Sequence, residues 1–134
     1  MTLSAADRLA ILDVITRADE AASRRDADGY VALFTADAVL DGAQGRHAGR
    51  QALHAAVGPV WAAEGPATLH LTLNPVIEPG PSDDQAVARS VLLIIDPSAP
   101  PALRHAAAIT QELRRTGGFW LITRRTVAAA AVPR

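Results

Sequence analysis

A chain of 134 residues is long enough for one domain with a sizeable core, and 49% of its residues are hydrophobic, which excludes a disordered protein. Its 13 basic and 14 acidic residues nearly balance, and the basic ones form no cluster, so nucleic acid is not an expected partner. The absence of cysteine excludes disulfides, and no apolar run approaches the roughly 18 residues of a membrane span. We therefore expect a cytoplasmic protein that does not cross a membrane.

Helical periodicity dominates the first half of the chain. Apolar residues recur at helical spacing over residues 4–25, after a start, Ser-Ala-Ala-Asp, that resembles a capping box. A short second helix is expected over residues 30–35 and a short strand over residues 38–41. A third helical pattern covers residues 50–63, and the Gly-Pro pair at 58–59 predicts a kink or an early stop within it.

From Thr68 onward the pattern changes to the alternation of strands, interrupted by the turn-forming segments PGPSDD, DPSAPP and TGG. Four long strands are expected, at residues 68–77, 85–95, 103–115 and 119–127. Helices followed by strands predict an α+β fold, in which an antiparallel sheet of four long strands and one short strand is covered on one face by three N-terminal helices. We expect a single domain over residues 1–134, with a frayed tail from about residue 128.

The first long strand, TLHLTLNP, has two unlike faces. Its leucines alternate with polar residues, and the polar set is His70, Thr72 and Asn74. If the polar face lines a cavity beneath the helices, the leucine face and the LLII run at 92–95 need another cover. We therefore expect a homodimer in which the sheets of two copies pack face to face.

The run RRDADGYVALFTADAVLDG, followed by GRQAL, the His70 strand and a final GGFWLI, resembles the SnoaL-like branch of the nuclear-transport-factor-2-like superfamily. The order of these motifs over almost the whole chain carries the resemblance. It implies a cone-shaped fold, in which a strongly curved antiparallel sheet wraps over the helices and encloses an apolar cavity. The superfamily includes polyketide cyclases, scytalone dehydratase, ketosteroid isomerase and limonene epoxide hydrolase, besides non-catalytic domains, so the fold alone assigns no function.

The resemblance places His70 where scytalone-dehydratase-like members carry a histidine that acts as acid or base in the cavity. An imidazole can accept and release a proton near neutral pH, and the alternatives are a hydrogen-bonded wall residue or one that faces water. The dehydratase pairs its histidine with a carboxylate from the first helix, but the matching position here is Ser23. Asp19, one turn earlier, or Asp41, at the end of the short strand, could supply the carboxylate, although Asp19 also fits a solvent-exposed charge. The expected catalytic residues are His70, Asp19 and Asp41.

Other residues are candidates for contact with a ligand. Asn74 shares a strand face with His70 and could orient a carbonyl group, and Tyr30 could donate a phenolic hydrogen bond, although strand-end chemistry and core packing also explain them. Trp61 could close the cavity after the predicted kink. Arg89 lies in an alternating stretch whose parity leaves both faces of the sheet open. The expected substrate-binding set is Tyr30, Asn74, Trp61, Ser23 and Arg89.

Neither a metal nor a cofactor is expected. The 4 histidines lack a close paired spacing with an acidic third ligand, and the dinucleotide-binding glycine pattern and the G-x-S-x-G nucleophile motif are both missing. We therefore expect a cofactor-independent acid–base enzyme, a cyclase, dehydratase or isomerase, acting on an apolar oxygenated metabolite such as a polyketide- or terpenoid-like intermediate. The alternative is a non-catalytic ligand-binding or dimeric scaffold domain. A carboxylate within hydrogen-bond reach of His70 in a closed pocket would favour the enzyme.

Overall fold

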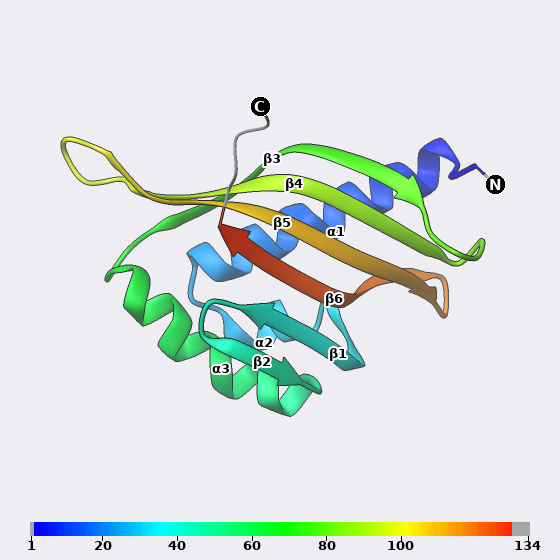
Figure 1. Cartoon of the computed structure of the whole chain (residues 1–134), viewed down its shortest axis with the longest axis horizontal. Coiled ribbons are helices and arrows are strands. Elements are labelled where there is room, and N and C mark those ends of the chain that lie inside the picture. Colours follow the sequence, from blue (N-terminus) through cyan, green and yellow to red (C-terminus); the bar gives the residue numbers. More distant parts are fainter. Residues whose placement is uncertain (1, 130–134) are drawn as a thin grey trace.

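A curved sheet of six strands forms the centre of the computed structural model, which describes residues 2–129 (Figure 1). The strands are β1 (Phe34–Gly42), β2 (Gly45–Ala48), β3 (Leu69–Pro79), β4 (Gln85–Asp96), β5 (Ala102–Thr116) and β6 (Phe119–Ala129). They lie in the order β2-β1-β6-β5-β4-β3, in which β1 and β6 are parallel and the other neighbours are antiparallel. The α+β class is confirmed, while the described sheet contains one more strand than expected and one parallel pair.

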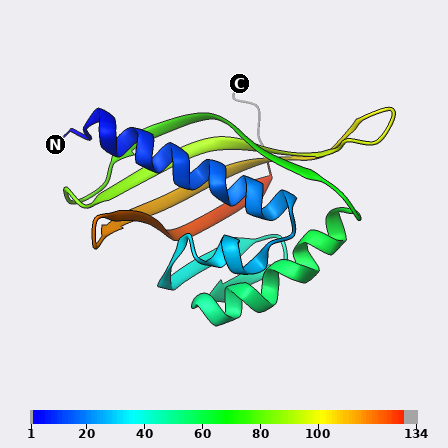
Figure 2. The ribbon, with the colours of Figure 1, turned by 180° about the vertical axis from the view of Figure 1, so that it is seen from behind.

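The helices cover one face of this sheet, with α1 lying across it and the other two beside β1 and β2 (Figure 2). They are α1 (Ala5–Ser23), α2 (Ala27–Val31) and α3 (Arg50–Glu64). The predicted capping box is confirmed, because the Ser4 hydroxyl accepts a hydrogen bond from the Asp7 backbone N–H at 3.0 Å. Between helices and sheet lies the core, whose largest fully buried side chains include Ile11, Phe34, Leu53, Leu113 and Ile122.

Two expectations for the segment between the first and third helices are wrong. The second helix begins at Ala27, because Asp26 caps its N-terminus by accepting a hydrogen bond from the Gly29 N–H, and it ends at Val31, since Phe34 already pairs with Ile122 of β6. The short strand expected at residues 38–41 is therefore a strand of 9 residues, β1. It turns back into β2, so the edge of the sheet here is a hairpin.

Helix α3 runs through Gly58 and Pro59 without the predicted early stop and ends only at Glu64. A proline inside a helix removes one backbone hydrogen bond, which favours a break. Burial outweighs that loss here, because side chains on both sides of the proline pack into the core: Leu53 and Val57 before it, and Trp61 after it. The continuation of α3 places Glu64 beside the first residues of β3.

Helix α1 is fastened to the free edge of β3 by its side chains. The Ser23 hydroxyl accepts a hydrogen bond from the His70 backbone N–H at 2.9 Å, and Asp19 accepts one from the Thr72 N–H at 2.8 Å. Farther along, the Arg8 guanidinium donates to the Ile77 carbonyl oxygen at 2.9 Å. These contacts satisfy backbone groups of an edge strand that no neighbouring strand reaches, and they fix α1 relative to the sheet.

The two faces of β3 differ as the alternation predicts. His70 is buried on the inner face, whereas Leu69, Leu71 and Leu73 remain 43%, 37% and 40% exposed on the outer face. Val91 of the neighbouring strand β4 adds to this apolar outer face at 38% exposure. The leucines therefore lie on the side of the sheet away from the helices.

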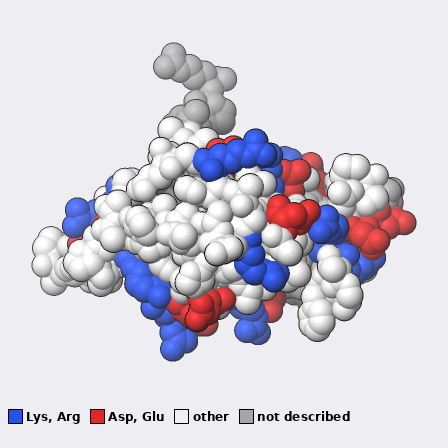
Figure 3. Space-filling view, turned by 90° about the horizontal axis from the view of Figure 1, so that it is seen from below, with Lys and Arg blue, Asp and Glu red and all other residues white. Residues whose placement is uncertain are grey.

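Charged side chains of both signs are interspersed around a largely uncharged centre on the face shown in Figure 3. No helix among residues 2–129 is long and apolar enough to cross a membrane. The frayed tail was expected from about residue 128, but residues 128–129 belong to β6, and residues 130–134 lie outside the described part of the chain.

Candidate active site

A cavity of about 650 Å³ lies between α3, Tyr30 of α2 and the inner face of the sheet. Most of its wall is apolar and includes Leu40, Val57, Val60, Trp61, Leu92, Ile94 and Val127. The buried polar side chains in the wall are Tyr30, Glu64, His70 and Arg125. An apolar cavity with a few polar groups is the usual form of a site for a small molecule, and its volume falls within the roughly 300–1,000 Å³ of such pockets.

His70 and Glu64 form a buried pair in this wall. Nε2 of His70 lies 2.7 Å from Oε1 of Glu64, and the two residues are 6% and 8% exposed. The pair forms because α3 ends at Glu64 and a short connection leads directly into β3. A carboxylate on one imidazole nitrogen orients the ring and selects its tautomer. The other nitrogen, Nδ1, is buried and has no hydrogen-bond partner among residues 2–129.

Thr68 and Arg25 surround the Glu64 carboxylate. The Thr68 hydroxyl donates to Oε1 of Glu64 at 3.0 Å, and Arg25 Nη2 donates to the same hydroxyl, also at 3.0 Å. Arg25 Nη1 lies 3.8 Å from Oε1 of Glu64. The charge of Glu64 is therefore compensated by Arg25 and by the Thr68 hydroxyl, besides its contact with His70.

Arg125 brings a positive charge to the cavity. The residue is 3% exposed, and its guanidinium carbon lies 5.7 Å from the centre of the Tyr30 ring. Its Nη1 atom is buried without a hydrogen-bond partner in the described part of the chain. A buried guanidinium with a free donor can stabilise negative charge that develops on a ligand oxygen.

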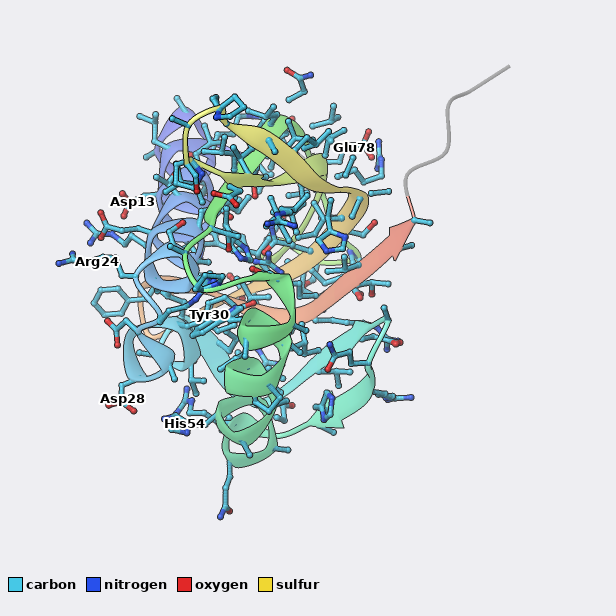
Figure 4. All side chains as sticks on the ribbon, turned by 90° about the vertical axis from the view of Figure 1, so that its left-hand side faces the viewer. Asp13, Arg24, Asp28, Tyr30, His54 and Glu78 are labelled. Atoms are coloured by element: carbon cyan, nitrogen blue, oxygen red, sulfur yellow. The ribbon has the colours of Figure 1, made fainter. Side chains whose placement is uncertain are left out.

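Tyr30 lies beside α3 and packs edge-on against Trp61, with 5.4 Å between the ring centres (Figure 4). Burial raises the pKa of Tyr30, so its hydroxyl remains a neutral group able to donate a hydrogen bond. Both aromatic residues line the cavity. Trp61 forms part of a helix that continues through Pro59 to Glu64.

Asp19 and Ser23 lie near His70 but bind its strand and not its ring. The hydroxyl of Ser23 accepts a hydrogen bond from the His70 backbone N–H, and the carboxylate of Asp19 accepts hydrogen bonds from the N–H and the hydroxyl of Thr72. Neither residue belongs to the cavity wall. Burial raises the pKa of Asp19, while the nearby Arg125 charge opposes that shift. These contacts argue for a structural role, because the carboxylate on the imidazole comes from Glu64.

Three other candidate residues lie outside the cavity wall. Asp41 faces away from its neighbour Leu40, which lines the cavity, and accepts a hydrogen bond from Arg124 at 3.1 Å. Asn74 is exposed at an irregularity of β3 and has a positive φ of 55°, a conformation that asparagine tolerates better than most residues. Arg89 is exposed on the outer face, where both of its terminal nitrogens bind Glu78. Asp41 was expected to act in catalysis, and Asn74 and Arg89 were expected to contact a ligand, and their placement outside the wall of this cavity corrects these expectations.

Glu64 and Arg125 are the functional candidates that the sequence interpretation missed. Glu64 follows the predicted break of the third helix, yet a signal existed, because it continues at helical spacing the buried stripe of Leu53, Val57 and Trp61. Arg125 follows an irregularity in the pairing of β5 and β6 at Thr123, after which inward-facing positions change from even to odd numbers. Strict alternation from Ile122 would place Arg125 outside.

The remaining histidines lie away from the buried pair. His47 and His105 contribute less buried parts of the cavity wall, whereas Nε2 of His54 is 2.8 Å from Asp28 on the surface (Figure 4). Across residues 2–129, no group of three or more His, Asp or Glu side chains is arranged to hold a metal ion.

Comparison with known proteins agrees with this fold. A family model described as the SnoaL-like domain matches residues 4–126. A protein of unknown function with a cystatin-like fold from Nostoc punctiforme is 24% identical, covers 99% of this chain and 98% of its own, and has a TM-score of 0.86. Aln2 from a Streptomyces species is 16% identical (96% and 94% coverage, TM-score 0.85), and LinA is 20% identical (96% and 95% coverage, TM-score 0.80). None of the curated proteins compared with the chain matches it.

Proposed function

The chain belongs to the family of SnoaL-like domains, and we propose that it is a cofactor-independent enzyme in which His70 moves a proton on an apolar oxygenated small molecule. The reaction class is cyclisation, dehydration or isomerisation, and the substrate resembles a polyketide or terpenoid intermediate. The observation that carries the proposal is the buried contact of 2.7 Å between His70 Nε2 and Glu64 Oε1 in the wall of an apolar cavity.

The geometry supports a base at Nδ1 of His70. Glu64 occupies Nε2, so a neutral imidazole that donates its Nε2 proton to Glu64 has its free electron pair on Nδ1. Nδ1 removes a proton from a carbon next to a carbonyl group of the substrate, and the electrons of the broken C–H bond move toward that carbonyl. The imidazolium then returns the proton to another carbon in an isomerisation, or to a departing hydroxyl group in a dehydration.

Arg125 and Glu64 each stabilise one of the two charges that develop in that step. Negative charge that builds up on the substrate oxygen is stabilised by the Arg125 guanidinium, which lines the same cavity. Positive charge that builds up on the imidazole is stabilised by Glu64, which takes the role expected of Asp19 or Asp41. The apolar walls lower the polarity around these groups, which strengthens both interactions.

A hydrogen–deuterium exchange assay tests the proposal without knowledge of the natural substrate. The probe is 2-tetralone, an apolar bicyclic ketone, whose acidic C–H groups exchange in D2O when a base removes their protons. We expect the wild type to accelerate this exchange, measured by proton NMR. His70→Ala and His70→Gln should lower the accelerated rate by about 10²-fold to 10⁴-fold, because neither side chain can accept the proton.

Two matched carboxylate variants separate Glu64 from Asp19. Glu64→Gln should lower the exchange rate strongly, because the amide cannot offset the imidazolium charge. Asp19→Asn removes the same charge from the neighbouring helix and should retain most of the rate, since the side-chain hydrogen bonds of Asp19 within residues 2–129 go to Thr72 and not to the imidazole of His70. Binding of 2-tetralone without any acceleration of exchange would refute catalysis and favour the non-catalytic binding domain. Equal losses in both variants would refute the assignment of Glu64.

A further inference from the structure

Arg25 is held in a fixed position by backbone carbonyl groups. Its guanidinium donates to the carbonyl oxygens of Ala22 and Gly65, each at 3.0 Å, and lies 3.4 Å from that of Trp61. The residue adopts a positive φ of 58°, which disfavours most side chains and which these contacts stabilise. Arg25 thus links the end of α1 to the end of α3.

The same guanidinium determines the orientation of the hydroxyl hydrogen of Thr68. Arginine has only donors, so the contact of 3.0 Å between Arg25 Nη2 and Thr68 Oγ1 uses the hydroxyl oxygen as acceptor. The single hydroxyl hydrogen is then free for the other partner, Oε1 of Glu64, at 3.0 Å. The chain of hydrogen bonds therefore has one direction, from Arg25 through Thr68 to Glu64.

That direction extends to His70. Oε1 of Glu64 accepts from Thr68 and lies 2.7 Å from Nε2 of His70. Oε1 of Glu64 already accepts from the Thr68 hydroxyl and lies 3.8 Å from Nη1 of Arg25, so it is best satisfied as the acceptor of an Nε2–H group of His70. Glu64 also lies at the C-terminus of α3, where the helix dipole disfavours a carboxylate, so it depends on this compensation.

We infer that Arg25 and Thr68 are positioning residues. They set the direction of the hydrogen bonds that lead through Glu64 to His70, so that His70 holds its proton on Nε2 and keeps Nδ1 free as the base. The inference rests on the proposed function of His70, but it makes a separate statement about the tautomer. Neither residue touches the cavity, and each acts on His70 through Glu64.

Nitrogen-15 NMR of the intact protein labelled at histidine reads the tautomer directly. In the wild type at neutral imidazole, the His70 signal should show a protonated Nε2 and an unprotonated Nδ1. Thr68→Ser keeps the hydroxyl and should keep this signature. Thr68→Val has nearly the same shape without a hydroxyl, and should shift a measurable fraction of His70 to the Nδ1–H tautomer. Arg25→Gln should do the same, and Arg24→Gln, at an exposed neighbour, is its control.

The exchange of 2-tetralone gives the second readout. Thr68→Val and Arg25→Gln should lower its rate by about 10-fold to 100-fold, as for other groups that orient a functional imidazole, while Thr68→Ser restores it. A wild type with Nδ1–H, or a Thr68→Val protein and an Arg25→Gln protein that both keep the wild-type signature, would overturn the inference. If instead the signatures change as expected but His70→Ala leaves exchange intact, the proton order stands and the proposed catalysis fails.

Discussion

Asp19 accepts two hydrogen bonds from one residue of β3: the backbone N–H of Thr72 reaches Oδ2 at 2.8 Å, and its hydroxyl reaches Oδ1 at 3.0 Å. Burial raises the pKa of Asp19 above its ordinary value of 3.8, although the charge of Arg125 and these two hydrogen bonds oppose the shift. The contribution of Asp19 to the free energy of unfolding is therefore fully present below pH 3.8, and it is lost as the pH rises through the higher pKa of the folded state.

We expect Asp19→Asn to gain stability relative to the wild type as the pH rises from 3.8 toward neutrality. The amide can still accept from the Thr72 N–H and donate to its hydroxyl, but it has no charge to bury. Urea unfolding at a series of pH values measures the difference in the free energy of unfolding. Asp13→Asn, which removes a charge from the exposed side of α1, is the control. A difference that shrinks as the pH rises would contradict the argument.

Arg125→Gln should weaken the binding of an anionic ligand more than that of a neutral one of the same shape. A hydrogen bond to a charged group contributes roughly 1.5–3 kcal/mol, so 2-naphthoate should lose at least about tenfold in affinity. The neutral ketone 2-acetylnaphthalene should lose less, because the apolar walls supply most of its binding. Isothermal titration calorimetry compares the two affinities. Equal losses of affinity would show that Arg125 shapes the cavity without distinguishing an anionic ligand from a neutral one.

Gln111 is fully buried in β5, and its amide oxygen and nitrogen have no hydrogen-bond partner within residues 2–129. Such a group loses its hydration without replacement. Gln111→Met, with a side chain of similar shape, should therefore raise the free energy of unfolding by about 1–3 kcal/mol. Gln51→Met, at an exposed position of α3, should change it by less than about 0.5 kcal/mol. Chemical denaturation of both variants checks this, and a less stable Gln111→Met protein would contradict it.

Our fourth prediction is a homodimer that forms through the sheet, because the leucine row of β3 is partly exposed. The wild type should sediment as a dimer at micromolar concentrations. Leu71→Lys should weaken that dimer at least about tenfold, because a charge would be buried between the sheets. Leu9→Lys places the same charge on exposed α1 and should leave the dimer intact. A wild type that sediments as a monomer would refute the prediction.

The strand period in the sequence was sufficient to separate the two faces of β3, but not to say which face is the inner one. Alternation puts His70 on the face opposite to its neighbouring leucines, because no irregularity interrupts the strand between Leu69 and Leu73. The inward direction of His70 was expected from the family resemblance. The same rule fails for Arg125, since the irregularity at Thr123 reverses the parity of β6. An extra residue in a strand leaves little trace in composition, so the inward charge was not predictable from pattern alone.

Glu64 was missed for a different reason. A proline in a helical pattern favours a break, and Pro59 stands between the well-patterned start of α3 and its last turn. Whether the helix continues depends on how much apolar surface its last turn buries, which is a property of the tertiary structure. The partner of His70 thus lay in the one turn whose existence local rules disfavour.

The attachment of α1 to β3 also determines how copies of the chain can meet. An open edge strand offers unpaired N–H and C=O groups to the strand of another molecule, which is how sheets grow into fibrils. Here the N–H groups of His70 and Thr72 and the carbonyl of Ile77 are already bound by side chains of α1. The opposite edge is β2, only 4 residues long. Growth of the sheet by strand addition is therefore blocked along β3 and restricted at β2, so the helix that closes the fold also protects it against aggregation.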